Sequence, residues 1–250
     1  MIDLRGRRAL VTGGSRGIGA AAARLLARAG ADVMIGYRAR AGDADLVVRD
    51  LLSSHVRAAA TAADISTREG AEQLVGATVD AFGGIDIFVA NAGIWPAADV
   101  ALGDMSDDQW LRTMRENVDS IFYTSRAVSR VISDGGRMVL ISSTAGQRGE
   151  AFHADYGASK GAVISFTKSL AIELAPRDVT VNSVAPGWVD TEMVSAPMEK
   201  GRARYSAAIP LGRIASAEDI AGPIVFLCSA LARHITGEIL NVNGGSVLCG

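Results

Sequence analysis

Short apolar runs of β-strand character alternate with longer helical patterns along almost the whole chain. An alanine-rich helical run leads to Ala29, and a second helical stretch covers residues 46–52. The strand-like runs lie at residues 9–11, 33–35, 56–62, 85–90, 138–141, 179–184 and 239–242. This alternation is typical of βαβ units, whose crossovers are right-handed. It predicts a doubly wound α/β fold with about seven parallel strands and helices on both faces of the sheet.

Nothing in the sequence divides the chain into two units. No change in composition, no linker rich in Gly, Ser or Pro, and no internal repeat interrupts its 250 residues. We therefore expect one domain over residues 1–250, a length that suits a single large α/β domain.

Composition excludes several classes of protein. Hydrophobic residues make up 49% and charged residues 21%, which argues against disorder, and a net charge of −2 without a basic block predicts no nucleic-acid partner. The three histidines have no metal-ligand spacing, so we expect no metal. Cys228 and Cys249 make no disulfide framework, the N-terminus lacks a signal-peptide core, and the apolar runs are too short to span a membrane. These features predict a soluble, cytoplasmic protein.

A glycine-rich loop, Thr12-Gly13-Gly14-Ser15-Arg16-Gly17-Ile18-Gly19, follows the first strand-like run and opens the first helix. Glycines at such a place let the backbone approach a pyrophosphate, whose charge then lies at the helix N-terminus. Many tight turns share this composition, but the position between strand and helix favours a dinucleotide site in a Rossmann-type fold.

The second strand-like run ends at Gly36-Tyr37-Arg38. An acid at this position binds the ribose 2′-hydroxyl of NAD, whereas an arginine accommodates the 2′-phosphate of NADP. Arg38 and Arg16 therefore predict NADP(H), with NAD less favoured. The alternative is that both are ordinary surface arginines.

Tyr156 and Lys160 lie four residues apart and so share one face of a helix. A lysine cation near a phenol is expected to lower the phenol pKa, which makes Tyr156 a candidate acid or base for carbonyl chemistry. Ser142 and Ser143 end a buried-looking strand thirteen residues upstream, where a hydroxyl could polarise the same carbonyl oxygen or serve only as a strand-end group.

Taken together, these motifs resemble the short-chain dehydrogenase/reductase family in its single-domain form. The resemblance covers essentially the whole chain and is nearest to 3-oxoacyl-carrier-protein reductases. Beyond the glycine loop it includes Asp64, Asn91-Ala92-Gly93, Asn117, Ser143, Tyr156 and Lys160, Pro186-Gly187 with Thr191, Ile235-Thr236-Gly237 and Asn243-Gly244-Gly245.

The resemblance implies a role for each matching residue. Tyr156 would be the acid/base, Ser143 would position the carbonyl, Lys160 would hold the nicotinamide ribose, and Asn117 would hold a water for proton relay. Asp64 would bind the adenine amine. The implied cofactor-binding set is Gly13, Ser15, Arg16, Gly17, Ile18, Gly19, Tyr37, Arg38, Asp64, Ile65, Asn91, Ala92, Gly93, Tyr156, Lys160, Pro186, Gly187, Val189 and Thr191.

The expected activity is NADPH-dependent reduction of a ketone or 3-oxoacyl group to a secondary alcohol. Two alternatives stay open: a cofactor-binding regulator of the same fold without turnover, and an alcohol or sugar dehydrogenase working in the oxidative direction. An extended-fold sugar epimerase or dehydratase would need a larger C-terminal region than 250 residues allow.

Residues 188–206, with Pro197 and Gly201, are interpreted as a loop-like substrate lid. Two interpretations stay open for six apolar or aromatic residues: they line an apolar pocket mouth, or they pack under the lid or at a subunit interface. These residues are Trp95, Phe152, His153, Trp188, Met193 and Met198. The resemblance permits an acyl-carrier protein as partner, but residues 132–136, before the fifth strand, are neutral or acidic where a docking surface should be basic. Arg177 is the basic residue that remains for such a surface. The apolar segments 220–227 and 239–248, for which the sequence offers no covering element, predict a homo-oligomer, and the resemblance implies that it is a tetramer.

Overall fold

The computed structural model describes residues 2–248, so Cys249 lies outside the described range. Seven parallel strands form one sheet in the order β3-β2-β1-β4-β5-β6-β7. Their bounds are β1 (Arg8–Thr12), β2 (Asp32–Tyr37), β3 (Ala58–Ala62), β4 (Ile85–Ala90), β5 (Ile132–Ile141), β6 (Thr180–Pro186) and β7 (Ile239–Val242). The order reverses between β1 and β4, which makes the carboxyl ends of these two strands the switch point of the sheet. The predicted fold class is confirmed.

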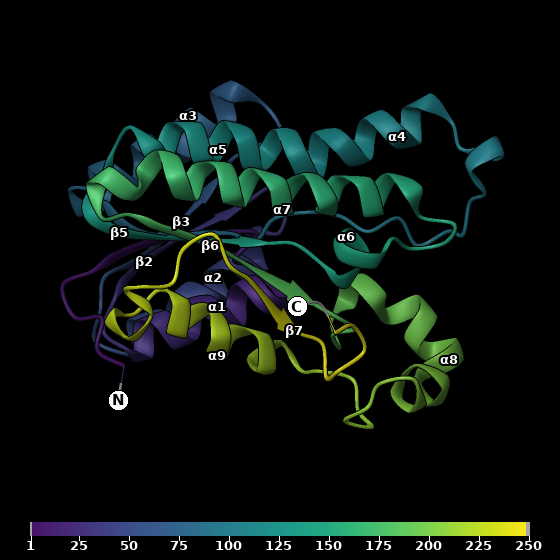
Figure 1. Cartoon of the computed structure of the whole chain (residues 1–250). Helices are drawn as coiled ribbons and strands as arrows, with labels where there is room; N and C mark the ends of the chain where they lie inside the picture. Colours follow the sequence, from purple (N-terminus) through teal and green to yellow (C-terminus); the bar gives the residue numbers. More distant parts are fainter. Residues whose placement is uncertain (1, 249–250) are drawn as a thin grey trace.

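Helices cover both faces of the sheet (Figure 1). One face carries α3 (Arg68–Phe82), α5 (Ser120–Ser129) and α7 (Ala154–Leu174), and α4 (Asp107–Met114) packs against α7. The other face carries α1 (Gly17–Arg28), α2 (Ala41–Leu52) and α9 (Ala217–Leu227). Beyond the carboxyl ends of the strands lie α6 (Thr144–Arg148) and α8 (Ser195–Ala207). Short 3₁₀ turns cover Leu102–Asp104, Ala175–Arg177, Glu192–Val194 and Ala230–Ala232, and the π-helical turn η2 (Arg115–Asp119) joins α4 to α5.

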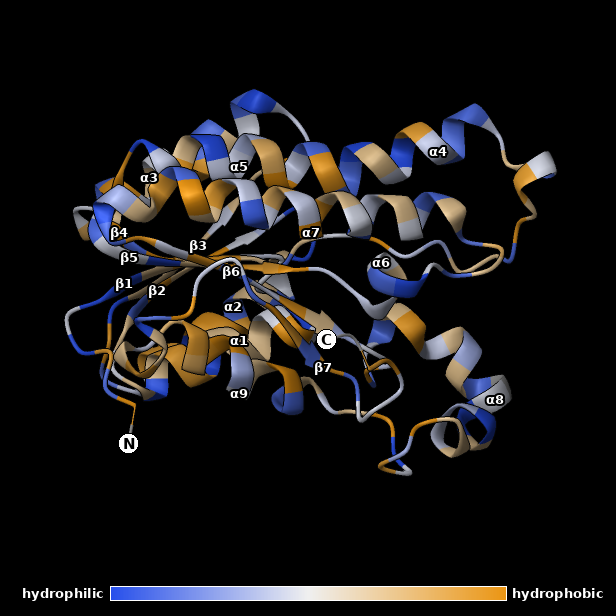
Figure 2. Ribbon diagram, in the orientation of Figure 1, coloured by the Kyte–Doolittle hydropathy of each residue, from blue (hydrophilic) through white to orange (hydrophobic). Residues whose placement is uncertain are grey.

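The sheet separates two hydrophobic cores. Along β1, Ala9 and Val11 belong to the core under α1, α2 and α9, whereas Leu10 belongs to the core under α3, α5 and α7. Successive side chains of a strand point to opposite faces, so a strand buried on both sides must be apolar throughout. This requirement explains the continuous apolar runs of the sequence. Figure 2 shows hydrophobic residues concentrated in α1 and α9, while α4 and α8 carry many hydrophilic ones.

The strands agree with the predicted runs except at β5. Residues 132–136, expected to precede the fifth strand, form its first half, because Ile132 pairs with Ile85 and the register then shifts to Ile87 opposite Arg137. Gly135, with φ of +72°, lies in this irregular stretch. Only some of its residues are buried, so the stretch has no continuous apolar run that would mark it as a strand in the sequence.

Residues 188–206 are not loop-like as expected, since most of them belong to a 3₁₀ turn and to α8. Pro197 lies in the first turn of α8, where backbone N–H groups have no helical partner and proline is tolerated. Gly201 has φ of −149° and marks a kink in the helix. Both helix breakers are therefore accommodated within a helical segment.

The expectation that residues 220–227 lack a covering element is also wrong. These residues lie in α9, which packs along α1, and Ile220 and Ile224 are fully buried. Among residues 2–248, no helix is both long and apolar enough to cross a membrane.

A partly buried ion pair joins the amino ends of β1 and β4. The Arg8 backbone N–H and Nε donate to Asp86 Oδ2 at 2.9 Å and 2.7 Å, and Nη2 donates to Oδ1 at 3.0 Å. Burial alone would raise the Asp86 pKa, but the hydrogen bonds from Arg8 and Ser133 outweigh it and hold the pKa below its usual value. The charged carboxylate therefore stabilises the folded state above its unfolded pKa, and this contribution is lost as the pH falls through the folded pKa.

Asp86→Asn should lower the free energy of unfolding by about 2 kcal/mol at pH 7, because it removes a charged acceptor of several hydrogen bonds. The difference from wild type should begin to shrink below about pH 4, the usual pKa of an unfolded aspartate, and should be lost as the pH falls through the lower pKa of folded Asp86. Urea denaturation between pH 3 and pH 7 measures both effects. Asp50→Asn, which removes the exposed pair with Arg24, is the matched control and should change stability by less than about 1 kcal/mol. Equal losses in the two variants would contradict a special role for the Arg8–Asp86 pair.

Candidate active site

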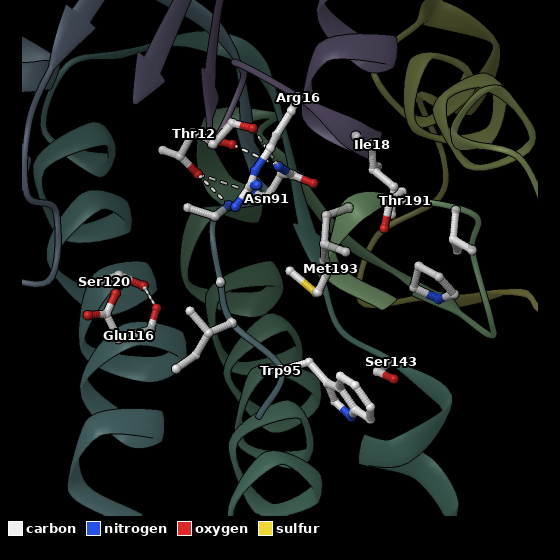
Figure 3. A pocket seen from close by; sticks show the side chains of 18 of the residues that line it. Thr12, Arg16, Ile18, Asn91, Trp95, Glu116, Ser120, Ser143, Thr191 and Met193 are labelled. Atoms are coloured by element: carbon white, nitrogen blue, oxygen red, sulfur yellow. Dashed lines mark hydrogen bonds between the residues drawn. The ribbon is translucent and has the colours of Figure 1, made fainter. Parts of the chain in front are cut away.

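A cavity of about 410 Å³ opens at the carboxyl ends of the strands, beside the switch point between β1 and β4. Every residue of the expected catalytic and cofactor-binding sets lines it, except Gly19 and Asn117. Figure 3 shows Arg16 at one end of this cavity and Trp95 with Ser143 at the other, with Met193 between them. The cavity is thus elongated between a basic end and an aromatic end.

The glycine loop has a backbone that only glycine adopts easily and that leaves no room for side chains. Gly13 and Gly17 have φ of +64° and +52°. A Cβ on Gly19 would lie 2.3 Å from the Gly13 carbonyl oxygen and 2.5 Å from Asn91 Nδ2. Helix α1 begins at Gly17, and its first residues, Gly17 and Ile18, line the cavity, so its unpaired N-terminal N–H groups lie at the cavity wall. Gly19 therefore packs against the back of the loop, and the loop has the shape of a phosphate cradle.

Hydrogen bonds between Thr12 and Asn91 join the carboxyl ends of β1 and β4. Thr12 Oγ1 accepts from the backbone N–H groups of Asn91 and Ala92 at 3.0 Å and 3.1 Å. Asn91 Nδ2 donates to the carbonyl oxygens of Thr12 and Gly13 at 3.0 Å and 3.2 Å. These bonds, drawn in Figure 3, fix the start of the glycine loop to the central strand.

Three arginines lie at the basic end, and each is paired with an acid. Arg16 Nη1 lies 2.6 Å from Glu192 Oε2, and Arg40 Nη2 lies 3.3 Å from the same oxygen. Arg38 Nη1 lies 2.6 Å from Glu116 Oε2, and this pairing raises the Arg38 pKa. Sequence reasoning found Arg16 and Arg38 but missed Arg40. A second basic residue two positions after Arg38 was the only available signal.

Asp64 follows β3 and holds the turn that leads into α3. Its Oδ1 accepts from the backbone N–H and the hydroxyl of Ser66 at 3.1 Å and 2.7 Å. The Ser66 hydroxyl is the main cause of a lowered Asp64 pKa, so the side chain is anionic at neutral pH. Asp64 and Ile65 both border the cavity, as expected for residues beside the adenine of a dinucleotide.

Ser143, Tyr156 and Lys160 meet at the inner wall of the cavity, from the end of β5 and the first turns of α7. Lys160 Nζ donates to the Ile141 carbonyl at 2.9 Å and lies 5.8 Å from the centre of the Tyr156 ring. Ser142, the other candidate hydroxyl, instead donates to the Lys160 carbonyl at 2.8 Å and holds β5 against α7. Ser143 is therefore the serine that belongs to this cluster.

The expected lowering of the Tyr156 pKa by Lys160 is wrong in this structure. Burial raises the Tyr156 pKa to about 12, although a hydrogen bond with Ser143 acts in the opposite direction. Burial also lowers the Lys160 pKa to about 8. Desolvation disfavours the charged form of each group, and the lysine is directed at a backbone carbonyl rather than at the phenol. At neutral pH the phenol is protonated and the lysine is mostly cationic.

Asn117 lies behind the cluster in the π-helical turn η2 and is fully buried. Its Oδ1 accepts from the Ile94 N–H at 2.7 Å, and its Nδ2 donates to the Ile94 carbonyl and to Ser159 Oγ, each at 3.0 Å. Ser159 Oγ in turn donates to the Tyr156 carbonyl at 2.8 Å. The Asn117 side chain therefore connects the loop after β4 to the turn of α7 that bears Tyr156.

The aromatic end contains three of the six residues expected at the pocket mouth: Trp95, Trp188 and Met193. His153 is buried behind Trp95, with ring centres 4.8 Å apart. The other three do not line the cavity: His153 is buried, Phe152 lies outside and is 56% exposed, and Met198 is buried in a small core with Ile209 and Ile214, as the lid-packing alternative expects. Apolarity alone did not separate a cavity wall from the packing under a helix.

Glu150 and Arg148 also border the aromatic end, and sequence reasoning missed both. Burial raises the Glu150 pKa, which a nearby His153 and a hydrogen bond from Trp95 only partly offset. Within the part of the chain that the structure describes, no group of three or more His, Cys, Asp or Glu side chains is arranged to hold a metal ion.

The glycine cradle at the switch point of a doubly wound sheet defines a dinucleotide-binding α/β protein. Residues 13–246 match the family model described as enoyl-(acyl carrier protein) reductase. The 3-oxoacyl-[acyl-carrier-protein] reductase of Vibrio cholerae is 42% identical over 98% of each chain. A short-chain dehydrogenase/reductase from Brucella melitensis, named as a glucose/ribitol dehydrogenase, superposes with a TM-score of 0.94 at 35% identity over 99% of each chain. A short-chain dehydrogenase from Burkholderia cenocepacia in complex with NADP superposes with a TM-score of 0.91 at 38% identity, over 97% of this chain and 98% of that one.

The chain belongs to the short-chain dehydrogenase/reductase family and is an oxidoreductase. Enzymes of this family use a nicotinamide dinucleotide, NAD(H) or NADP(H). The cradle at Gly13 to Gly19, with its close backbone approaches, fits such a group.

Gly19→Ala should weaken nicotinamide dinucleotide binding at least about tenfold, because the added methyl group must push the Gly13 carbonyl out of the cradle. Fluorescence titration measures the dissociation constant. Gly76→Ala, in a part of α3 where a Cβ meets nothing within 4 Å, is the control and should leave binding unchanged. Wild-type affinity in Gly19→Ala would show that this close approach does not matter.

Proposed function

We propose that this single domain is an NADP(H)-dependent carbonyl reductase that converts a ketone or 3-oxoacyl thioester into a secondary alcohol. The observation that carries the proposal is the cluster of Ser143, Tyr156 and Lys160 on the inner wall of a cavity that begins at a phosphate cradle. The same cavity can therefore hold a dinucleotide and a carbonyl substrate side by side.

The cofactor would lie along the residues that line the cavity from the basic end to Lys160. When bound, nicotinamide supplies the hydride for the carbonyl carbon. The glycine loop and the N-terminus of α1 would bind the pyrophosphate, and Asp64 and Ile65 would border the adenine. Asn91 to Gly93 would border the middle of the cofactor, between its adenine and its nicotinamide. Residues Pro186, Gly187, Val189 and Thr191 would cover the nicotinamide, and Lys160 would bind its ribose.

Tyr156 is the proposed proton donor to the carbonyl oxygen. Because its pKa is about 12, the phenol carries its proton at neutral pH and is ready to donate it. Ser143 would donate a second hydrogen bond to the same oxygen, so the two hydroxyls stabilise the negative charge that develops there. The Lys160 cation would then stabilise the phenolate that remains, and Asn117 would position the relay that restores the proton.

The preference for NADP(H) is supported by charge at the basic end. Arg16, Arg38 and Arg40 all border the cavity there. β2 ends at Tyr37 and is followed by Arg38, so no acid occupies the position that would bind the ribose hydroxyls of NAD. A guanidinium group matches a phosphate in geometry and charge.

The substrate end combines apolar walls with one carboxyl group. Trp95, Trp188 and Met193 would contact an apolar substrate body, since burial of apolar surface contributes roughly 25 cal/mol per Å². Glu150 favours a second candidate, oxidation of a sugar or polyol, because a carboxylate accepts hydrogen bonds from hydroxyl groups. The Brucella melitensis protein is named for a sugar and a polyol, which agrees with that alternative.

A carrier protein is a weaker proposal than a small thioester. Arg177, the basic residue near the expected docking surface, pairs with Asp134 at 2.9 Å and donates to the carbonyl oxygens of Ser129 and Ile132. Its guanidinium is thus held by two backbone carbonyl oxygens as well as by Asp134, which argues against docking of an acidic partner. The homotetramer stays a prediction, supported by the exposed Leu111, Phe122 and Ile172 on α4, α5 and α7.

Tyr156→Phe should lower kcat for carbonyl reduction at least about 100-fold, the usual contribution of a general acid, while the Kd of NADPH changes little. Stopped-flow and fluorescence titration measure the two quantities. Tyr123→Phe, on α5 and outside the cavity, is the matched control. Near-normal turnover in Tyr156→Phe would rule out the proposed proton donor.

The pH dependence of reduction should follow Lys160 rather than Tyr156. Below about pH 8, kcat should be flat, because Tyr156 is protonated and Lys160 is cationic; above it, kcat should fall as Lys160 loses its proton. Lys160→Arg keeps its charge throughout and should remove this alkaline fall, whatever its absolute rate. An unchanged midpoint in Lys160→Arg would assign the titration to another group.

A nicotinamide-absorbance assay over three substrate classes tests the proposed function. The highest kcat/KM should belong to a ketone or to an acetoacetyl thioester with NADPH. A higher value for an aldose or polyol in the oxidative direction would replace this proposal with the sugar dehydrogenase. No absorbance change with any substrate would favour the regulator without turnover.

A further inference from the structure

Glu192 places a carboxylate oxygen between two of the arginines at the basic end. Its Oε2 lies 2.6 Å from Arg16 Nη1 and 3.3 Å from Arg40 Nη2. Arg40 also pairs with Asp43 at 3.3 Å through Nη1, the guanidinium nitrogen that does not contact Glu192. One anionic oxygen shared by two guanidinium groups is the arrangement that a phosphate oxygen takes in an arginine site.

The two acids at this end differ in how easily they can move. Glu116 pairs with Arg38 from the helical turn η2, and its side chain is only 14% exposed. Glu192 is 57% exposed and lies at the start of the segment that leads into α8. Thr191 next to it packs on the glycine loop, where a Cβ on Gly17 would lie 3.4 Å from Thr191 Cγ2. The Glu192 side chain can therefore be displaced into solvent more easily than the Glu116 side chain.

We propose that Glu192 occupies the place of the cofactor 2′-phosphate and competes with it for Arg16 and Arg40. Binding of NADP(H) would replace the Glu192 carboxylate between the two arginines and release the start of the 188–206 segment. A cofactor without this phosphate would leave the Glu192 contacts in place. Glu192 thus acts through the arginines as a positioning residue that sets the cofactor preference, and this inference rests on the proposed dinucleotide site.

The test compares dissociation constants of NADPH and NADH for wild type and Glu192→Gln, measured by fluorescence titration at low salt. Loss of the competing charge should lower the dissociation constant of NADPH about threefold, which matches the free energy of an exposed ion pair. The dissociation constant of NADH should not change. Glu192→Asp should keep most of the wild-type affinities. Glu199→Gln, which removes an exposed glutamate of α8 with no ion pair among the described residues, is the matched control.

A combined variant shows whether Glu192 acts through the arginines. With Arg16 and Arg40 both changed to Gln, adding Glu192→Gln should no longer alter the Kd of NADPH. Equal tightening of NADPH and NADH by Glu192→Gln, or no tightening of NADPH, would overturn the inference. Wild type that binds NADPH no tighter than NADH would instead contradict the proposed NADP(H) preference, and the Glu192→Gln comparison would still decide the role of Glu192.

Discussion

The hydrogen bonds between Thr12 and Asn91 are the interaction on which the site depends. They join β1 and β4 where the strand order reverses, and a doubly wound sheet opens a crevice only at that point. The same bonds hold the Gly13 carbonyl, against which Gly19 packs without room for a methyl group. The glycine loop and the loop after β4 are therefore held together by hydrogen bonds where both begin. This contact defines the shape of the cavity between the two loops.

Burial gives the cluster of Ser143, Tyr156 and Lys160 its chemical character. The cavity wall removes water from both Tyr156 and Lys160, and this one cause moves their pKa values in opposite directions, to about 12 and about 8. A protonated phenol beside a mostly cationic lysine suits the donation of a proton to a carbonyl oxygen. Asn117 fixes this geometry from behind through Ile94 and Ser159, so it ties the turn of α7 that bears Tyr156 to the loop after β4.

Local patterns in the sequence predicted the fold class, the glycine loop and the place of Tyr156 and Lys160 on one helix face, because each depends on residues close together in the chain. The missed residues depend on contacts between distant segments. Glu192 meets Arg16 and Arg40 across more than 150 positions, and no local pattern marks such a pair. Met193 lines the cavity and Met198 packs in a core, although both are apolar residues of one segment. Which of them faces the cavity depends on how that segment folds.

The most direct test of the proposed chemistry follows the hydride itself. NADPH carrying deuterium at C4 of the nicotinamide, on either face in separate reactions, is turned over with the best ketone or thioester, and the alcohol is examined by mass spectrometry and NMR. We expect one deuterium on the carbinol carbon from one of the two cofactors, with the hydroxyl proton drawn from solvent through Tyr156. An alcohol without deuterium from either cofactor would contradict hydride transfer in this cavity.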